Sequence, residues 1–296
     1  MPPSAIIIRD KTPSIISFLL PLLQAHRTSS PPPTTTTSPP FFLGISGIQG
    51  AGKTTLTTQL HRALTSAPYH LRLLTLSIDD LYLSHDQLTA LSSAHPLNPF
   101  LHQRGPPGTH DVRLGELLFK KLANQDPLVA VPAYDKSAHG GRGDRVPEGL
   151  WRKERAPWDV VVLEGWCVGF TPIGRNEVER RWRESIALGK GTLRKHRLAD
   201  LEWLDEQLMR YQGLWGRLQA LVQVDAQNLD YVYEWRLQQE HDLIKLKGAG
   251  MSDDQVKAFV DNYMPSYELY LPGLAHHHHL RFVVGRDRNV VVKEEN

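Results

Sequence analysis

Apolar residues in this chain occur in two patterns: short continuous runs, and longer segments in which they recur every three or four positions. The runs are typical of strands buried on both faces of a parallel sheet, whereas the periodic segments are typical of helices. Strands are predicted at residues 41–45, 71–78, 158–166, 218–224 and 280–284, and helices at 53–66, 113–124, 175–188, 198–211, 231–247 and 252–263. This alternation predicts an α/β fold, a doubly wound parallel sheet flanked by helices.

The first forty residues have a different character. Apolar residues at 14–23 recur at helical spacing, and the stretch is too short to span a membrane. We expect an amphipathic helix packed on the domain, with Thr12 as its N-cap and Pro13 as its first residue. Residues 28–40 are rich in Pro, Thr and Ser, a composition typical of a linker or an exposed loop. The expected organisation is a helical segment at 1–27, a linker at 28–40 and one large domain at 41–296.

Composition narrows the possible functions only slightly. The 296 residues are 41% hydrophobic, enough for a large core, and the net charge of +2 provides no global field for nucleic acid or an anionic membrane. The single cysteine, Cys167, excludes an intramolecular disulfide and a cysteine-based zinc site, and is expected in the core. With no targeting signal apparent, we expect a cytoplasmic protein.

A glycine-rich stretch, GISGIQGAGKTT at residues 44–55, follows the first predicted strand and opens a predicted helix. It satisfies the pattern G-x-x-x-x-G-K-[ST], in which backbone N–H groups and a helix N-terminus surround phosphates. Lys53 is expected to contact the phosphates as a catalytic cation, and Thr54 to supply a hydroxyl to Mg²⁺. ATP and Mg²⁺ are the predicted cofactors, and the predicted nucleotide-binding residues are Gly47, Ile48, Gln49, Gly50, Ala51, Gly52, Lys53, Thr54 and Thr55.

Acidic residues end the next two predicted strands, where ligands of an open parallel sheet bind. Asp79 and Asp80 follow the second strand, and a carboxylate there could accept the proton of a substrate hydroxyl. Asp79 is preferred as this base, and Asp80 is suited to capping the following segment. Glu164 ends the third strand and is expected to hold Mg²⁺ directly or through water, with a purely structural carboxylate as the alternative.

The motifs resemble those of a known group of kinases. A Walker A loop followed by IDDLY at 78–82 and LEGW at 163–166 resembles the phosphoribulokinase, uridine kinase and pantothenate kinase group of P-loop kinases. Longer stretches resemble the D-glycerate 3-kinases of plants and their fungal relatives: QRGPPGTHD at 103–111, PAYDKSAHGGRGDR at 132–145, EGWCVGF at 164–170, YVYEWRLQQEHDL at 231–243 and MPSYELYLPGL at 264–274.

This resemblance implies a P-loop NTPase kinase fold with a helical lid around residues 229–250, and phosphorylation of D-glycerate to 3-phosphoglycerate. Arg236 would be the lid cation that reaches the phosphates, or else an exposed helical arginine. Glycerate carries a carboxylate and two hydroxyls, and Arg104 is the natural partner of the carboxylate. The substrate candidates are Asp79, Arg104, Thr109, His110, Asp111, Tyr134, Lys136 and Arg142, with Arg145 in the same basic loop.

Two alternatives remain open from the sequence. The acceptor could be another small hydroxylated molecule, a nucleoside or a pantothenate-like compound, although the loop around Arg104 is better suited to a small acid. A regulatory protein that binds ATP without transferring phosphate is the other, and the presence of Asp79 and Arg236 speaks against it. Neither nucleic acid nor a membrane is expected as a partner, and we expect a monomer or weak homo-oligomer. The histidines at 276–279 are expected in a surface loop rather than a metal site.

Overall fold

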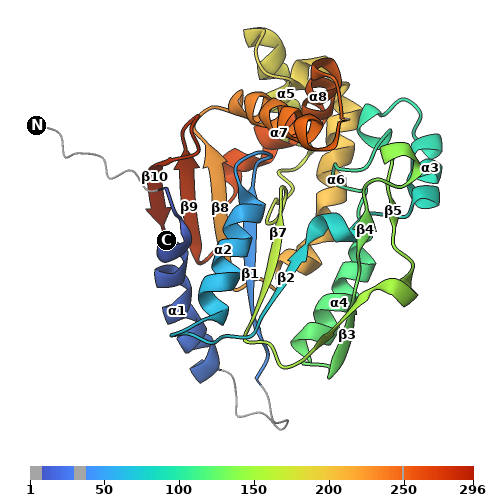
Figure 1. Ribbon diagram of the computed structural model, residues 1–296. Coiled ribbons are helices and arrows are strands. Elements are labelled where there is room, and N and C mark those ends of the chain that lie inside the picture. Colours follow the sequence, from blue (N-terminus) through green and yellow to red (C-terminus); the bar gives the residue numbers. More distant parts are fainter. Residues whose placement is uncertain (1–8, 30–37, 249) are drawn as a thin grey trace, which may run out of the picture.

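The structure is a computed structural model and describes residues 9–29, 38–248 and 250–296. Its centre is a six-stranded sheet in the order β10-β9-β8-β1-β7-β2 (Figure 1). Five strands are parallel, and the edge strand β10 is antiparallel to β9. The strands are β1 (Phe41–Gly47), β2 (Leu73–Ser77), β7 (Val160–Gly165), β8 (Ala220–Ala226), β9 (His279–Val284) and β10 (Val290–Glu295). The doubly wound parallel sheet predicted from the sequence is confirmed, with β10 as an addition.

Nine α-helices are present in the described parts of the chain. They are α1 (Thr12–Ser29), α2 (Lys53–Thr65), α3 (His85–Ala94), α4 (Val112–Ala123), α5 (Arg175–Leu188), α6 (Leu198–Trp215), α7 (Tyr231–Lys247), α8 (Asp253–Asp261) and α9 (Met264–Tyr270). Short 3₁₀ turns occur at Ile78–Leu81, Pro99–Leu101, His139–Gly141, Glu148–Leu150, Leu193–Lys195 and Leu271–Gly273. No helix within these described ranges combines the length and apolar character needed to cross a bilayer.

Helices cover both faces of the sheet because neighbouring residues of a strand point in opposite directions. The ring of Phe41 in β1 meets His26 of α1, whereas the ring of Phe42 stacks on Phe119 of α4. All seven residues of β1 are buried, as the continuous apolar run predicts. On the α1 side, Ile15 and Leu19 belong to the same hydrophobic core as the strands, so the N-terminal helix packs on the domain.

Several predicted boundaries were wrong, for identifiable reasons. The predicted helix at 252–263 corresponds to α8, which ends at Asp261 because Asn262 caps it. Helix α9, with Pro265 in its first turn, was not predicted. Helix α1 continues to Ser29, so residues 28 and 29 do not belong to a linker, and most of the predicted linker lies outside the described residues. His279 starts β9 and is buried instead of lying in a surface loop.

Two small antiparallel strand pairs were not predicted from the sequence. β3 (Leu128–Val131) pairs with β6 (Arg152–Arg155), and β4 (Tyr134–Asp135) pairs with β5 (Asp144–Arg145). Strand β3 is apolar but has only four residues, LVAV, and its partner β6 has the sequence RKER and no apolar residue. Strands β4 and β5 have two residues each, too few to show a pattern. The β4–β5 pair is important for the site because the segment between its strands, residues 136–143, reaches the central cavity.

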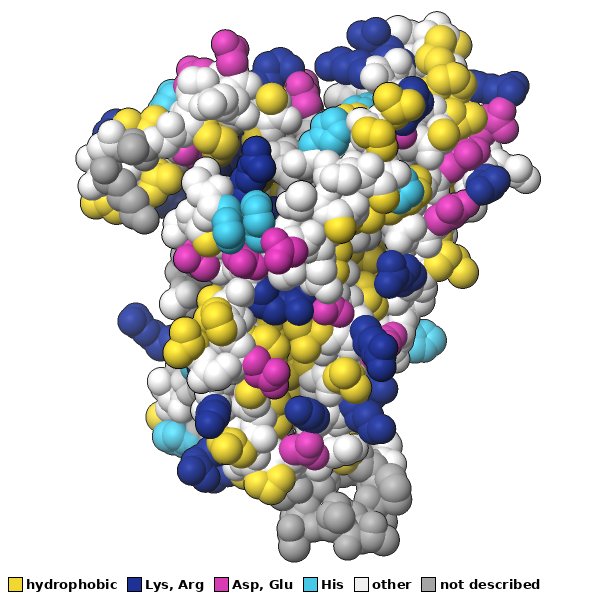
Figure 2. All heavy atoms as spheres, turned by 90° about the vertical axis from the view of Figure 1, so that its right-hand side faces the viewer, with side chains coloured by type: hydrophobic (Ala, Val, Ile, Leu, Met, Phe, Trp, Pro, Cys, Tyr) yellow, Lys and Arg dark blue, Asp and Glu magenta, His cyan; other side chains and the backbone are white. Residues whose placement is uncertain are grey.

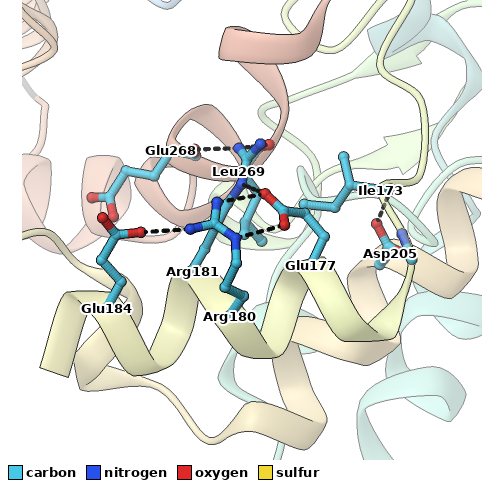
Figure 3. A network of polar contacts seen from close by, with 9 residues as sticks. Ile173, Glu177, Arg180, Arg181, Glu184, Asp205, Glu268 and Leu269 are labelled. Atoms are coloured by element: carbon cyan, nitrogen blue, oxygen red, sulfur yellow. Dashed lines mark hydrogen bonds and ion pairs between the residues drawn. The ribbon is translucent and has the colours of Figure 1, made fainter. Parts of the chain in front are cut away.

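Helices α5, α6 and α9 are joined by the polar network in Figure 3. Arg181 on α5 pairs with Glu177 and donates a hydrogen bond to the carbonyl of Leu269 on α9 at 2.7 Å. Asp205 on α6 accepts hydrogen bonds from the backbone just before α5. The next contact reaches the glycine loop, since the Tyr267 hydroxyl on α9 accepts from the Gln49 N–H at 3.1 Å. The network therefore supports the wall behind the phosphate site.

Candidate active site

A cavity of about 1200 Å³ opens at the carboxyl ends of β1, β7 and β2. These ends lie side by side because β7 stands between the other two, with Ser46 of β1 opposite Gly165 and Ser77 of β2 opposite Glu164. The walls come from the glycine loop, the turn after β2, one face of α3, residues 101–104 and 136–142, the end of β7, and helices α7 and α8. The cavity thus lies where ligands of open α/β sheets bind.

The glycine loop presents its backbone to this cavity. Gly50 and Gly52 have positive φ angles, +78° and +90°, which glycine adopts without steric cost. Their N–H groups have no hydrogen-bond partner among the described residues, and α2 begins directly after them at Lys53. The side chains of Ile48 and Ala51 are buried, so these residues are available to a ligand only through their backbone. Free amides and a helix N-terminus at one place form an anion site.

Lys53 lies inside the curve of the loop. Its ammonium donates to the carbonyls of Gly47 at 2.6 Å and Ile48 at 3.1 Å. Burial lowers the pKa of Lys53, and the negative charges of Glu164 and Asp79 act in the opposite direction. The cavity also contains the side chains of Thr54 and Thr55. The ammonium is therefore held at the loop, ready to pair with an anion that the amides bind.

The two aspartates after β2 face different surroundings. Asp79 lines the large cavity, whereas Asp80 lies in a small apolar space and accepts a hydrogen bond from the Tyr134 N–H at 3.3 Å. Burial raises the pKa of both carboxyls, but the Lys136 ammonium reverses the effect for Asp79 and holds its pKa below the usual value. For Asp80, burial outweighs the opposing effects of the Tyr134 N–H and of nearby cations, and its pKa stays raised. The geometry supports Asp79 as the proton acceptor.

Both oxygens of Asp79 are held by donors. The Tyr82 hydroxyl donates to Oδ1 at 3.0 Å, and the Lys136 ammonium lies 2.5 Å from Oδ2. Tyr82 is buried and stacks on the His110 ring at a centroid distance of 4.4 Å. Burial lowers the pKa of His110 to about 4, so this imidazole is neutral near pH 7. The donors fix the plane of the carboxylate and leave lone pairs free for a substrate hydroxyl.

Thr54 and Glu164 both line the cavity, from the start of α2 and the end of β7. A hydroxyl and one carboxylate, without a complete protein cage, fit Mg²⁺, which keeps several waters and shares phosphate oxygens with a nucleotide. The described residues contain no cluster of three or more His, Cys, Asp or Glu arranged to hold a metal alone. The donor set is therefore consistent with a metal that arrives with its nucleotide.

The predicted substrate residues divide into two groups. Arg104, Lys136 and Arg142 line the cavity. The others lie behind its wall: Thr109 bonds within its own loop, His110 contacts the Tyr211 hydroxyl at 2.8 Å, Asp111 caps α4 and pairs with Arg145, and Tyr134 packs on Tyr82. Arg145 also donates to the Tyr82 carbonyl at 2.9 Å. This second group shapes the turn that carries Asp79 instead of lining the cavity.

Helix α7 closes the phosphate side of the cavity. Arg236 lines it, pairs with the buried Glu240 at 2.9 Å and lies over the Phe259 ring of α8. The same helix touches the glycine loop, since a Cβ on Gly50 would lie only 2.4 Å from the Cβ of Trp235. The guanidinium of Arg288, in the β9–β10 turn, bridges the Gly50 carbonyl at 2.7 Å and α7. The predicted lid helix and the nucleotide loop are thus in direct contact.

Sequence reasoning missed some of the cavity wall. Tyr82 is in the IDDLY motif, three residues after Asp79, and its place one helical turn later could have suggested a contact. Tyr263 lines the cavity and accounts for Gly105, where a Cβ would lie 2.3 Å from the tyrosine oxygen. One face of α3 contributes His85, Leu88, Thr89, Ser92 and Ser93, for which the sequence offered no chemical signal.

The surface beside this site carries both signs of charge. On the face formed by α3, α4 and the β4–β5 pair, Lys and Arg side chains are interspersed with Asp and Glu (Figure 2). This agrees with the small net charge of the whole chain.

Comparisons with known proteins agree with this fold. No family model matches the sequence. An uncharacterized kinase of Schizosaccharomyces pombe is 40% identical over 242 residues, covering 81% of this chain and 84% of the relative. The chloroplastic D-glycerate 3-kinase of Arabidopsis thaliana is 35% identical over 236 residues, 78% of this chain and 48% of that protein. The solved structure of a D-glycerate 3-kinase from Cryptococcus neoformans superposes with a TM-score of 0.90 at 36% identity, covering 96% of this chain and 99% of that one.

Proposed function

Since the chain belongs to the D-glycerate 3-kinase family of P-loop kinases, we propose that it transfers the γ-phosphoryl group of ATP to the 3-hydroxyl of D-glycerate. The fold is that of a P-loop kinase, and the enzyme is an ATP-dependent phosphotransferase with an alcohol group as acceptor. The observation that carries the proposal is that one cavity contains both a glycine loop suited to phosphates and a carboxylate, Asp79, whose pKa is lowered. A nucleotide-dependent switch would have no use for the second.

Asp79 acts on the acceptor. Its carboxylate accepts the proton of the 3-hydroxyl while that oxygen forms a bond to the γ-phosphorus and the bond to the β–γ bridging oxygen breaks. ADP leaves with the bridging oxygen, and the proton remains on Asp79 until solvent removes it. Tyr82 and Lys136 keep the carboxylate in one orientation throughout, because each holds one of its oxygens.

The phosphate side stabilises the charge that moves from the γ-phosphate to ADP. The amides of the glycine loop hold the phosphates, and Lys53 would exchange the carbonyls of Gly47 and Ile48 for phosphate oxygens. Mg²⁺ would be held by Thr54 and Glu164 and would supply electrostatic stabilisation. Arg236 on α7 would turn from Glu240 toward the phosphates as the lid closes and excludes water.

The acceptor lies on the opposite side, between Asp79 and the basic segment 136–142. Arg104, Lys136 and Arg142 give this end of the cavity a positive charge suited to a carboxylate. A three-carbon acid bound there by its carboxylate would present its far hydroxyl to Asp79. Among the described residues that line this end of the cavity, Asp79 is the one acidic side chain, and Lys136 pairs with it.

The test is an acceptor panel with product identification. The purified chain is incubated with Mg²⁺-ATP and, separately, D-glycerate, L-glycerate, glycerol, uridine and pantothenate, and products are identified by NMR. We expect 3-phosphoglycerate from D-glycerate and slow turnover of glycerol, which lacks the carboxylate. Lys53→Ala, purified in parallel, controls for a contaminating kinase.

Two outcomes would contradict the proposal in different ways. Efficient phosphorylation of uridine or pantothenate without turnover of D-glycerate would replace the acceptor. Formation of 2-phosphoglycerate would keep the acceptor and overturn its orientation relative to Asp79.

A further inference from the structure

Five Lys and Arg side chains of the described residues line the cavity: Lys53, Arg104, Lys136, Arg142 and Arg236. Lys53 is bound to carbonyls of the glycine loop, and Arg236 pairs with Glu240 on the lid. These two belong to the phosphate side. The remaining three lie on the acceptor side, and their hydrogen bonds show that they are not equivalent.

Most N–H donors of the Arg104 guanidinium are bound to other groups of the protein. Its Nη1 donates to the carbonyls of Gly141, at 2.8 Å, and Arg142, and its Nη2 lies 3.4 Å from the Lys136 carbonyl. Its Cζ also lies over the Tyr134 ring, 5.6 Å from the ring centroid. A guanidinium has five N–H donors, so these contacts take three of them. Arg104 thus fastens both ends of residues 136–142 to the loop at 103–105.

The Lys136 side chain also has a partner within the protein. Its ammonium lies 2.5 Å from Oδ2 of Asp79, and this contact holds the pKa of Asp79 below its usual value against the effect of burial. A carboxylate ligand that drew Lys136 away would release the proposed base. In this structure Lys136 therefore orients the Asp79 carboxylate and keeps it ionised.

Arg142 differs from the other four. Among the described residues that line the cavity, it is the one lysine or arginine whose side chain has no hydrogen bond or ion pair with another residue. Its backbone carbonyl is bound by Arg104, so the start of the side chain is fixed while its guanidinium is exposed. The preceding turn is also anchored, because the His139 ring stacks on His85 of α3 at a centroid distance of 3.8 Å.

We propose that Arg142 binds the carboxylate of the acceptor and makes the enzyme select an acid, and that Arg104 is a positioning residue that holds residues 136–142 in place. The assignment rests on the proposed function, and it differs from the pairing of Arg104 with the carboxylate that the sequence suggests. A free planar guanidinium on a fixed backbone can form a two-point contact with a carboxylate at little cost in ordering. Arg104 could do so only with donors left over from its loop contacts.

The test compares D-glycerate with its neutral amide, which has the same shape without the negative charge. Values of kcat/KM are measured for both acceptors, or Ki values for the amide where its turnover is too slow. Arg142→Gln should lower kcat/KM for D-glycerate by about 10²-fold and leave the amide nearly unaffected, because only a charged group loses a charge-assisted contact. The preference for the acid should therefore disappear.

Arg104→Gln should behave differently. It releases the segment that carries Lys136 and Arg142, so both acceptors should lose about the same factor and the preference for the acid should remain. In Arg104→Gln, the acid limb of the plot of kcat against pH should move to higher pH, because a loosened Lys136 no longer keeps Asp79 ionised. Arg142→Gln should leave this limb in place. Arg113→Gln, exposed on α4 outside the cavity, is the matched control, and thermal unfolding of each variant checks folding.

The result that overturns the proposal is an acid preference that survives Arg142→Gln. If the preference instead disappears in Arg104→Gln, the carboxylate belongs to Arg104, and if it survives in both variants, the carboxylate is bound elsewhere. Failure of the proposed function would be seen separately, as a parent enzyme that does not phosphorylate D-glycerate.

Discussion

The two sides of the cavity are built in different ways. The phosphate side is centred on one continuous segment, residues 47–55, which offers mainly backbone N–H groups, a helix N-terminus and one lysine. The acceptor side is assembled from the turn after β2, residues 103–105 and 136–142, α3 and Tyr263, and it offers side chains. A triphosphate is the same in every such enzyme, so a fixed backbone shape suffices, whereas an acceptor must be distinguished by the chemistry and placement of side chains.

The two sides also differ in what holds their working groups. Lys53 is held by carbonyls of its own loop. Asp79 is held by its neighbour Tyr82 and by the distant Lys136, and the segment of Lys136 is held by Arg104. Substitutions on the phosphate side should therefore act directly and strongly, and those on the acceptor side should spread through shared contacts.

The largest effect is expected at Lys53. Lys53→Ala removes the cation from the phosphates and should lower kcat/KM by at least about 10³-fold, at the upper end of what one charge-stabilising donor contributes. Folding should be retained, since the ammonium contacts only its own loop. Steady-state kinetics and thermal unfolding measure the two quantities. Lys121→Ala, exposed on α4, is the control, and turnover at the parent rate in Lys53→Ala would refute the assignment of the nucleotide site.

The next effect separates the neighbouring aspartates. Asp79→Asn should lower kcat by at least about 10²-fold with ATP affinity nearly unchanged, because a positioned base typically contributes about 10² to 10⁴ in rate. Asp80→Asn is the matched control and should lose less, since Asp80 lies outside the cavity and bonds to the Tyr134 N–H. Parallel kinetics and nucleotide titration decide the matter. A larger loss of kcat in Asp80→Asn would exchange the roles of the two residues.

A smaller effect is expected when a hydrogen-bond donor to Asp79 is removed. Burial raises the pKa of this carboxyl, the contact with Lys136 lowers it most, and the hydrogen bond from Tyr82 also lowers it. Tyr82→Phe removes one of these donors, so the pKa should rise and the acid limb of the kcat profile should move to higher pH, with about a tenfold loss of kcat at its plateau. Tyr134→Phe is the control, because the buried Tyr134 hydroxyl has no hydrogen-bond partner in the described parts of the chain. An unmoved limb in Tyr82→Phe would remove Tyr82 from the support of the base.

The smallest difference is expected inside the glycine loop. Gly50→Ala and Gly52→Ala both place a side chain at positive φ, but only the first puts a Cβ 2.4 Å from Trp235. Among the described residues, a Cβ on Gly52 would have no neighbour within 4 Å apart from its own adjoining backbone. Gly50→Ala should therefore reduce the free energy of unfolding by about 1–3 kcal/mol more than Gly52→Ala. Denaturant unfolding without nucleotide measures this difference. Equal stabilities would mean that α7 does not press on the loop as the structure indicates.

The local pattern of apolar residues was sufficient to predict most helices and strands of the fold. The helices at 175–188 and 231–247 have the predicted bounds, and all five parallel strands were found within a few residues. Burial on both faces leaves a continuous apolar run, which can be recognised without knowing the neighbours. The β3–β6 and β4–β5 pairs leave no such trace, because their strands are short or polar and are stabilised by residues about ten to thirty positions away.

The sequence by itself determined the nucleotide loop, the α/β class and the candidate base, since each depends on residues that are adjacent in the chain. Only the tertiary structure decided which charged side chains are free. In sequence, Arg104, Lys136, Arg142 and Arg145 are four similar cations; in the fold, three are bound by carbonyls or carboxylates and one is not. The physical reason is that a cation's availability depends on the acceptors around it, and here those acceptors come from other segments that the fold brings within hydrogen-bond distance.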